Sequence, residues 1–156
     1  MRKVMLALDY DPTAQKIAET GFALAQLLNA EVILLHVIAD PVYYSSAAYS
    51  PIMGFTGYTD ADTLQQDPAS SLEKASQHFL DEFKKQLGDE KIRTLVANGD
   101  LAGSILTAAK ETDADIIVMG SHSRRWLEAI VMGSVTEKVL HHTTIPLFII
   151  PTKQKK

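Results

Sequence analysis

The sequence predicts a single doubly wound α/β domain, in which five parallel strands in the order 3-2-1-4-5 carry helices on both faces. Its 156 residues are an ordinary length for one domain. Short apolar runs alternate with longer amphipathic segments, and strands that alternate with helices form the right-handed crossovers of a parallel sheet. Two of the runs, at 31–38 and 115–119, are almost continuously apolar, which is typical of strands covered on both faces.

The first part of the chain contains two expected strands and one helix. The first strand is expected at 3–8, where an apolar run stops at Asp9. Pro12 and Thr13 begin a pattern of apolar residues at helical spacing, which we expect to end at Asn29. The second strand is expected at 31–38. His36 lies in the middle of this run, and we interpret it as a buried core histidine rather than a ligand.

Residues 40–68 have a different composition. They hold four of the five tyrosines, two glycines, three prolines and several serines. We expect a long loop here, and such loops in compact domains are commonly functional or disordered.

The second part of the chain alternates helices and strands. The expected elements are a helix at 69–87, a strand at 91–97, a turn at 98–100, a helix at 101–112, a strand at 115–119, a glycine-started segment at 120–132, a helix at 134–142 and a strand at 146–150. The α/β domain is therefore expected to span 1–152, followed by a polar tail at 153–156.

Composition excludes several classes of protein. The net charge of −4 argues against a nucleic-acid binder, which usually carries a strongly basic face. The chain has no cysteine, so disulfides, thiol catalysis and cysteine-ligated metals are excluded. Asp9 and Asp11 cut short the first apolar run, so it does not read as a secretion signal. We expect a soluble cytoplasmic protein without a metal site of its own.

The segment after the fourth strand has the parts of a phosphate site. Ligands of doubly wound sheets bind beyond the carboxyl ends of the strands, where the strand order reverses. There the chain reads Gly120-Ser121-His122-Ser123-Arg124-Arg125, and Gly133-Ser134 opens the next helix. Glycine lets backbone amides approach an anion, and the start of a helix attracts negative charge. Arg124 and Arg125 add positive charge. The same pattern also fits an ordinary glycine-bounded loop and a capped helix, because glycine-rich helix starts are common.

This pattern resembles the signature of the universal stress protein family, which is G-x-x-G, nine residues, then G-[ST]. Gly120, Gly133 and Ser134 match it, and Ser123 stands where the second glycine is expected. The segments 4–9, 34–37, 113–120, 133–140 and 145–147 also resemble the strands and the closing helix of that family. The resemblance covers the chain except for the 40–68 region.

The resemblance implies an adenine-nucleotide site that holds ATP, or ADP or AMP, with Mg²⁺ on the phosphates. Asp9 would bind the nucleoside, Val37 would contact adenine through its backbone, and Met119 and Gly120 would line the entry to ribose and phosphate. The phosphates would be held by His122, Ser123, Gly133, Ser134, Val135 and Thr136. The family also implies a homodimer, with the last strand Leu147–Ile150 paired across a twofold axis.

Ser123 leaves two outcomes open. If its position needs a positive φ angle, serine strains the backbone. If the position needs only a small residue, the serine hydroxyl can donate to phosphate. The expected function is therefore an ATP-binding regulatory or stress-response module, not a metabolic enzyme. The alternative is a nucleotide-free member of the same family that acts through protein contacts.

Two further classes fit less well. A nucleotidyl-transferring enzyme would need a serine- and glycine-rich loop after the first strand, where this chain has Asp9-Tyr10-Asp11-Pro12. A phosphoacceptor domain would need an aspartate at the end of the third strand, which instead ends in Ala97-Asn98-Gly99. No arrangement of a general base beside a nucleophile is evident, so we name no catalytic residue.

Overall fold

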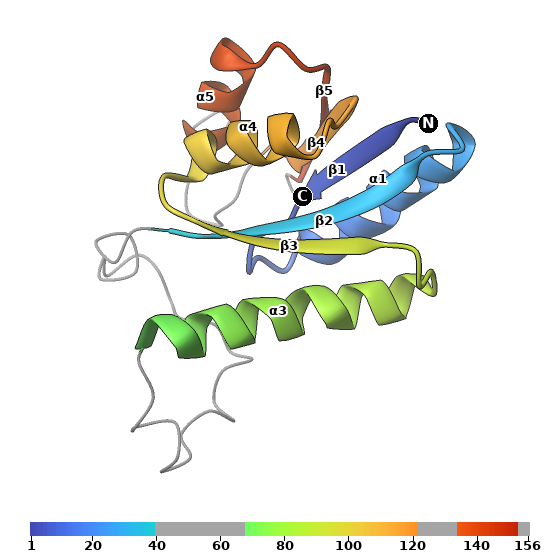
Figure 1. Ribbon diagram of the computed structural model, residues 1–156. Coiled ribbons are helices and arrows are strands. Elements are labelled where there is room, and N and C mark those ends of the chain that lie inside the picture. The colour runs from blue at the N-terminus through green and yellow to red at the C-terminus, as the bar shows by residue number, and fades with distance from the viewer. Residues whose placement is uncertain (40–67, 122–133, 153–156) are drawn as a thin grey trace, which may run out of the picture.

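The computed structural model describes residues 1–39, 68–121 and 134–152 (Figure 1). Residues 40–67 of the expected loop, most of the 120–132 segment and the 153–156 tail lie outside the described residues, whereas Pro68, the last residue of the expected loop, begins a helix instead. The described elements are β1 (Lys3–Ala7), α1 (Ala14–Leu27), β2 (Glu31–Ile38), α3 (Pro68–Leu87), β3 (Arg93–Asn98), α4 (Leu101–Glu111), β4 (Ile116–Gly120), α5 (Ser134–His142) and β5 (Leu147–Ile150).

The strands form one parallel sheet in the order β3-β2-β1-β4-β5, which confirms the predicted fold class. β1 lies in the centre, where Leu6 pairs with Leu34 of β2 on one side and with Val118 of β4 on the other. From β1 the chain moves outward to β2 and β3, and then returns to β4 and β5 on the opposite side. The strand order therefore reverses between β1 and β4.

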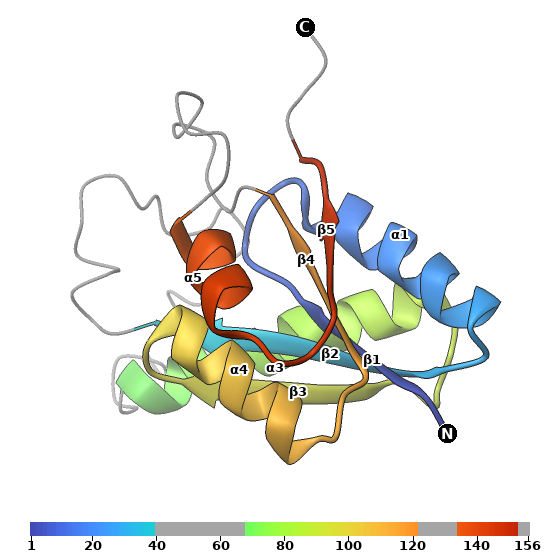
Figure 2. The ribbon, with the colours of Figure 1, turned by 90° about the horizontal axis from the view of Figure 1, so that it is seen from above.

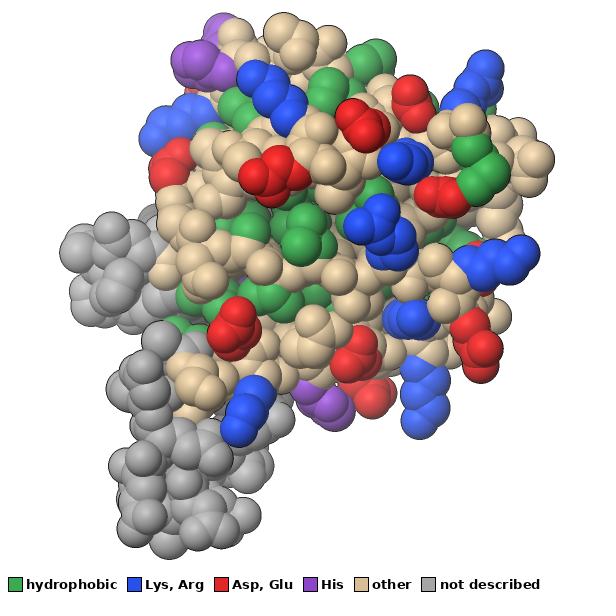
Figure 3. Space-filling view, in the orientation of Figure 1, with side chains coloured by type: hydrophobic (Ala, Val, Ile, Leu, Met, Phe, Trp, Pro, Cys, Tyr) green, Lys and Arg blue, Asp and Glu red, His purple; other side chains and the backbone are tan. Residues whose placement is uncertain are grey.

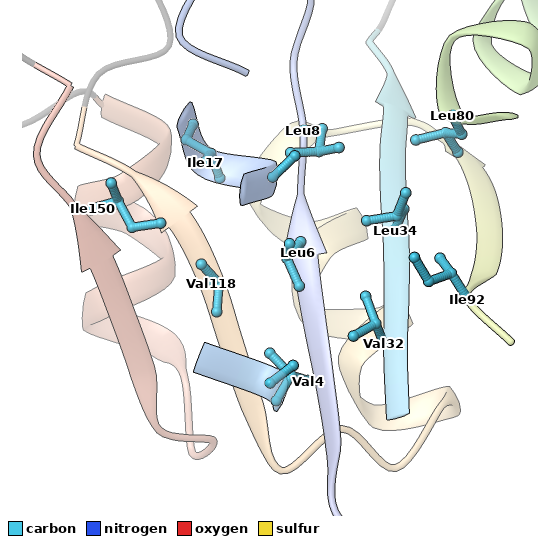
Figure 4. Packing of buried hydrophobic residues seen from close by; sticks show 12 residues of the cluster. Val4, Leu6, Leu8, Ile17, Val32, Leu34, Leu80, Ile92, Val118 and Ile150 are labelled. Atoms are coloured by element: carbon cyan, nitrogen blue, oxygen red, sulfur yellow. The ribbon is translucent and has the colours of Figure 1, made fainter. Parts of the chain in front are cut away.

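The helices cover both faces of the sheet (Figures 1 and 2). α1 and α3 lie on one face, and α4 and α5 lie on the other. Successive side chains of a strand point to opposite faces, so β1 sends Leu6 into the cluster under α1 and α3 (Figure 4) and Met5 into the cluster under α4 and α5. This arrangement explains why the expected central strands lack polar alternation.

Element ends differ from the sequence-based expectations by one or two residues. β1 ends at Ala7 rather than Leu8, because the Leu8 carbonyl accepts a hydrogen bond from the His36 ring instead of continuing the ladder. The predicted stop of α1 is confirmed, since Asn29 adopts a φ of 51° directly after the helix. Asp100 caps α4 by accepting from the backbone N–H of Gly103 at 2.8 Å.

Two surface features bear on function. In the described ranges, no helix is long and apolar enough to cross a bilayer. On the face drawn in Figure 3, lysine and arginine side chains alternate with aspartate and glutamate rather than gathering into a patch of one sign. This face therefore lacks the basic surface that nucleic-acid binders use.

Candidate functional site

A pocket lies at the carboxyl edge of the sheet, where the strand order reverses between β1 and β4. Ligands of doubly wound sheets bind at this point. The pocket encloses about 580 Å³ of empty space, including the part that is open to solvent. It is lined by Ala7, Leu8, Asp9, Asp11, Thr13, Ala14, Ile17, Leu35, Val37, Leu101, Ile105, Met119, Gly120, Val135 and Thr136.

The turn between β1 and α1 supplies the acidic wall of the pocket. The backbone N–H of Tyr10 donates to Oδ1 of Asp9 at 2.8 Å, and the N–H of Asp11 donates to the Asp9 carbonyl at 2.8 Å. Oδ1 of Asp11 accepts from both the N–H and the hydroxyl of Thr13, at 2.8 and 2.7 Å. These local bonds fold the turn tightly, and they hold Asp9 and Asp11 at the rim of the pocket.

β2 contributes Val37, whose backbone faces the space beyond the end of β1. In a parallel strand the backbone groups of alternate residues point to the same neighbour. The Leu35 carbonyl accepts from the N–H of Leu8 at 2.8 Å, so Leu35 faces β1 and Val37, two residues on, faces the same way. β1 has ended at Ala7 by that point. The Val37 backbone is therefore directed toward the pocket rather than into a strand pair.

β4 and the start of α5 form the opposite wall. Gly120 is tightly enclosed, since a Cβ atom there would lie 2.6 Å from Cδ1 of Ile17 and 2.8 Å from Cγ2 of Thr152. The buried Thr136 hydroxyl donates to the Gly120 carbonyl at 2.8 Å, which ties the first turn of α5 to the end of β4. Because this bond uses the hydroxyl proton of Thr136, the same hydroxyl cannot also donate to an anion. Helix geometry leaves the first backbone N–H groups of α5 without an intrahelical partner, and the start of a helix is a kind of place that favours anions.

The structure brings together six of the predicted site residues, which come from four separate elements. They are Asp9, Val37, Met119, Gly120, Val135 and Thr136. Ser134 begins α5 beside them. His122, Ser123, Arg124 and Gly133 lie outside the described residues, so their predicted phosphate contacts stay predictions. Within the described part of the chain, no cluster of three or more His, Cys, Asp or Glu side chains could hold a metal ion.

Sequence reasoning missed the apolar wall contributed by α4. Leu101 and Ile105 lie in the first turns of α4 and line the pocket. A signal was present, because α4 follows β3 and so begins at the same carboxyl edge that the reversal rule selects. Asp11 and Thr13, two and four residues after Asp9, also line the pocket and were not among the predicted site residues.

The model of the universal stress protein family matches residues 1–151. The chain belongs to the universal stress protein family. It is 28% identical to universal stress protein MJ0577 of Methanocaldococcus jannaschii, over 97% of this chain and 96% of that protein. It is also 27% identical to universal stress protein YxiE of Bacillus subtilis, over 95% and 97% of the two chains. These full-length matches agree with the resemblance drawn from the sequence.

Solved structures of the family share the fold. The structure of MJ0577, studied to assign its biochemical function, aligns with a TM-score of 0.76 at 26% identity and covers 99% of this chain and 98% of that one. A universal stress protein in complex with cAMP aligns with a TM-score of 0.62 at 15% identity over 96% and 95% of the two chains. The second likeness is too distant in sequence to show more than the common fold.

Proposed function

We propose that this universal stress protein binds an adenine nucleotide, ATP or its ADP or AMP relatives, in the pocket between β1 and β4. The observation that carries the proposal is the meeting of three different walls at one edge of the sheet. Carboxylates stand on one side, apolar side chains line the interior, and the start of helix α5 stands on the other side. A nucleotide carries one group suited to each wall, since ribose hydroxyls can donate to carboxylates, the base can pack on apolar side chains and the phosphates can accept from amides.

The nucleoside part fits the β1 and β2 side of the pocket. The Asp9 carboxylate at the rim can accept from ribose hydroxyl groups. The Val37 backbone carries one donor and one acceptor toward the space beyond β1, which suits the hydrogen-bonding edge of adenine. Apolar contact with the base comes from Leu35, Ile105 and Met119.

The phosphate part fits the α5 side. The amides of Ser134, Val135 and Thr136 and the dipole of α5 favour an anion there. His122, Ser123, Arg124 and Gly133 complete the proposed contacts by their position in the signature. Mg²⁺ would be held by the phosphates and its own waters, since it loses its hydration shell reluctantly.

We propose a regulatory role in the cytoplasm rather than turnover of a metabolite. The described pocket contains the carboxylates of Asp9 and Asp11 and two threonines, and both hydroxyls serve local structure, since Thr13 donates to Asp11 within the same turn and Thr136 donates to the Gly120 carbonyl. The cAMP complex of a distant relative supports nucleotide binding as a property found within this fold. Such a module would report nucleotide occupancy through a change in its surface.

A nucleotide-free role through protein contacts is the second candidate. Ser123 departs from the family signature, and β5 forms an edge of the described sheet. Phe148 on β5 is 41% exposed, and an exposed apolar residue on an edge strand favours pairing with another chain. We propose that Leu147–Ile150 pairs with the same strand of a second copy, and this homodimer is compatible with either candidate.

The test is calorimetric titration of the nucleotide-free protein with Mg²⁺ and ATP, beside a Gly133→Asp variant. The added carboxylate should repel phosphate and abolish micromolar binding of ATP, but it should leave binding of adenosine nearly unchanged. Ala23→Asp is the matched control, because it adds the same charge at an exposed position of α1.

Loss of ATP binding in Gly133→Asp alone would support the phosphate site. Equal loss in both variants would point to a general charge effect. A folded wild-type protein that binds neither ATP nor ADP would overturn the proposal and favour the nucleotide-free alternative.

A further inference from the structure

One buried polar side chain has no part in the proposed pocket. His36 lies on β2 with its side chain on the α1 and α3 face, and it is 1% exposed. Its Nδ1 lies 2.8 Å from the Leu8 carbonyl. Because a carbonyl only accepts, Nδ1 carries the proton and Nε2 holds a lone pair. In the described part of the structure Nε2 has no hydrogen-bond partner. A buried nitrogen without a hydrogen-bond partner calls for an explanation, so we looked for a role of the one hydrogen bond that His36 makes.

The ring is held by aromatic side chains from two other elements. The ring centroids of His36 and Tyr10 are 4.3 Å apart, and those of His36 and Phe79 are 5.4 Å apart. Tyr10 and Phe79 also contact each other, at 4.6 Å. The Tyr10 hydroxyl lies 3.1 Å from Oγ of Ser76 on α3. Three elements therefore meet around one imidazole, and tilted or edge-on ring pairs of this kind fix side-chain orientation.

The two contacts of His36 flank a residue of the proposed nucleotide site. The hydrogen bond holds the Leu8 carbonyl, and the ring contact holds Tyr10, so Asp9 lies between two restrained neighbours. The peptide group that joins Leu8 to Asp9 contains the bonded carbonyl itself. A change in that bond would rotate this peptide plane and redirect the Asp9 side chain relative to the pocket.

We propose that His36 is a positioning residue for the nucleotide site, which sets the direction of the Asp9 carboxylate through the Leu8 carbonyl and the Tyr10 ring without touching the ligand. This inference rests on the proposed adenine-nucleotide function. It assigns His36 to the nucleoside end of the ligand, because Asp9 is at that end. The effect of His36 should therefore be the same for adenosine and for ATP.

The test measures binding of Mg²⁺ and ATP, and of adenosine, by calorimetry in four proteins: wild type, His36→Phe, Asp9→Asn and the double variant. Phenylalanine keeps a ring against Tyr10 but removes the donor to Leu8. We expect His36→Phe to weaken both ligands about tenfold, as loss of a buried hydrogen bond does. In the Asp9→Asn background the same change should weaken binding no further, because the residue through which it acts is already altered.

A conservative pair of variants separates the hydrogen bond from simple packing. Asn carries an amide donor near the place of Nδ1, whereas Gln carries it near the place of Nε2. His36→Asn should therefore bind adenosine more tightly than His36→Gln, and this comparison remains decisive if His36→Phe fails to fold. Val32→Ala is the stability control, since Val32 is buried on the same face of β2 about 13 Å away and should not alter affinity.

The outcomes are distinct. Wild-type protein that binds no adenine ligand would overturn the proposed function and this inference together. Wild-type binding that is unchanged in folded His36→Phe would overturn this inference alone. This inference would also be overturned if His36→Phe weakened binding tenfold both in wild type and in the Asp9→Asn background. Equal affinities of His36→Asn and His36→Gln for adenosine would overturn it as well.

Discussion

Acidification should destabilise this protein through His36, and the size of the effect follows from its surroundings. Burial lowers the pKa of His36 from 6.5 to about 4, and the hydrogen bond to the Leu8 carbonyl opposes this shift only in part. The ring is therefore neutral in the folded protein at pH 5 and protonated in the unfolded chain. The unfolded state binds more protons between pH 6.5 and 4, so the free energy of unfolding must fall as the pH falls through this range.

The magnitude can be worked from the two pKa values. A difference of one unit corresponds to about 1.4 kcal/mol, so the whole shift is worth about 3 kcal/mol. The folded state is free of this penalty above pH 6.5 and carries all of it below pH 4. Between pH 7 and pH 5 the loss amounts to about 2 kcal/mol, which is a large part of the stability of an ordinary domain.

Urea unfolding followed by circular dichroism at pH 7, 6 and 5 measures this effect. His36→Phe is the comparison, because it removes the titrating ring and leaves every carboxylate in place. The difference between the two pH profiles then isolates His36. A difference that changes by less than about 0.5 kcal/mol from pH 7 to pH 5 would refute the reasoning, since this is the size of an ordinary surface effect.

Three further changes test the packing, the capping and the edge of the sheet. Gly21→Ala should destabilise the protein by about 1–3 kcal/mol in urea unfolding, because the added Cβ would lie 2.6 Å from Cδ2 of the buried Leu6. Adding Leu6→Ala to the same chain should recover part of this loss. Asp100→Ala should cost about 1 kcal/mol by removing the cap on Gly103, whereas Asp100→Asn should cost less; equal losses would argue against the cap. Phe148→Glu should shift the protein from dimer to monomer in sedimentation equilibrium, and an unchanged mass would count against the proposed β5 contact.

The fold could be predicted because its main signals are local. Each central strand is a continuous apolar run, and each helix has an apolar stripe of its own, so the alternation of elements was readable without knowledge of contacts. Ser134–His142 was predicted with its observed bounds. The expected ends of several elements differ from the observed ones by one or two residues, and at β1 a distant side chain accounts for the difference. β1 stops one residue early because His36, 28 positions away, takes the Leu8 carbonyl.

The candidate site was predictable at the strand ends and at the start of α5, but not along α4. Asp9 and the start of α5 follow from strand ends and glycine positions, which are visible in the sequence. The apolar wall of Leu101 and Ile105 depends on how α4 crosses the sheet, and residues of this type look like any other core residue. The contact of Tyr10 with Phe79 joins positions 69 apart, and no periodicity links them.

The prediction that His36 is a buried core histidine was correct but incomplete. The sequence favoured a core histidine, and the side chain is indeed buried. A core histidine must nevertheless place at least one nitrogen on a partner, and here that partner is the carbonyl that leads into the pocket. Leucine would fill the same space without a polar atom to satisfy. We proposed above that the imidazole instead positions the β1–α1 turn, and the difference between Asn and Gln at position 36 decides whether that explanation holds.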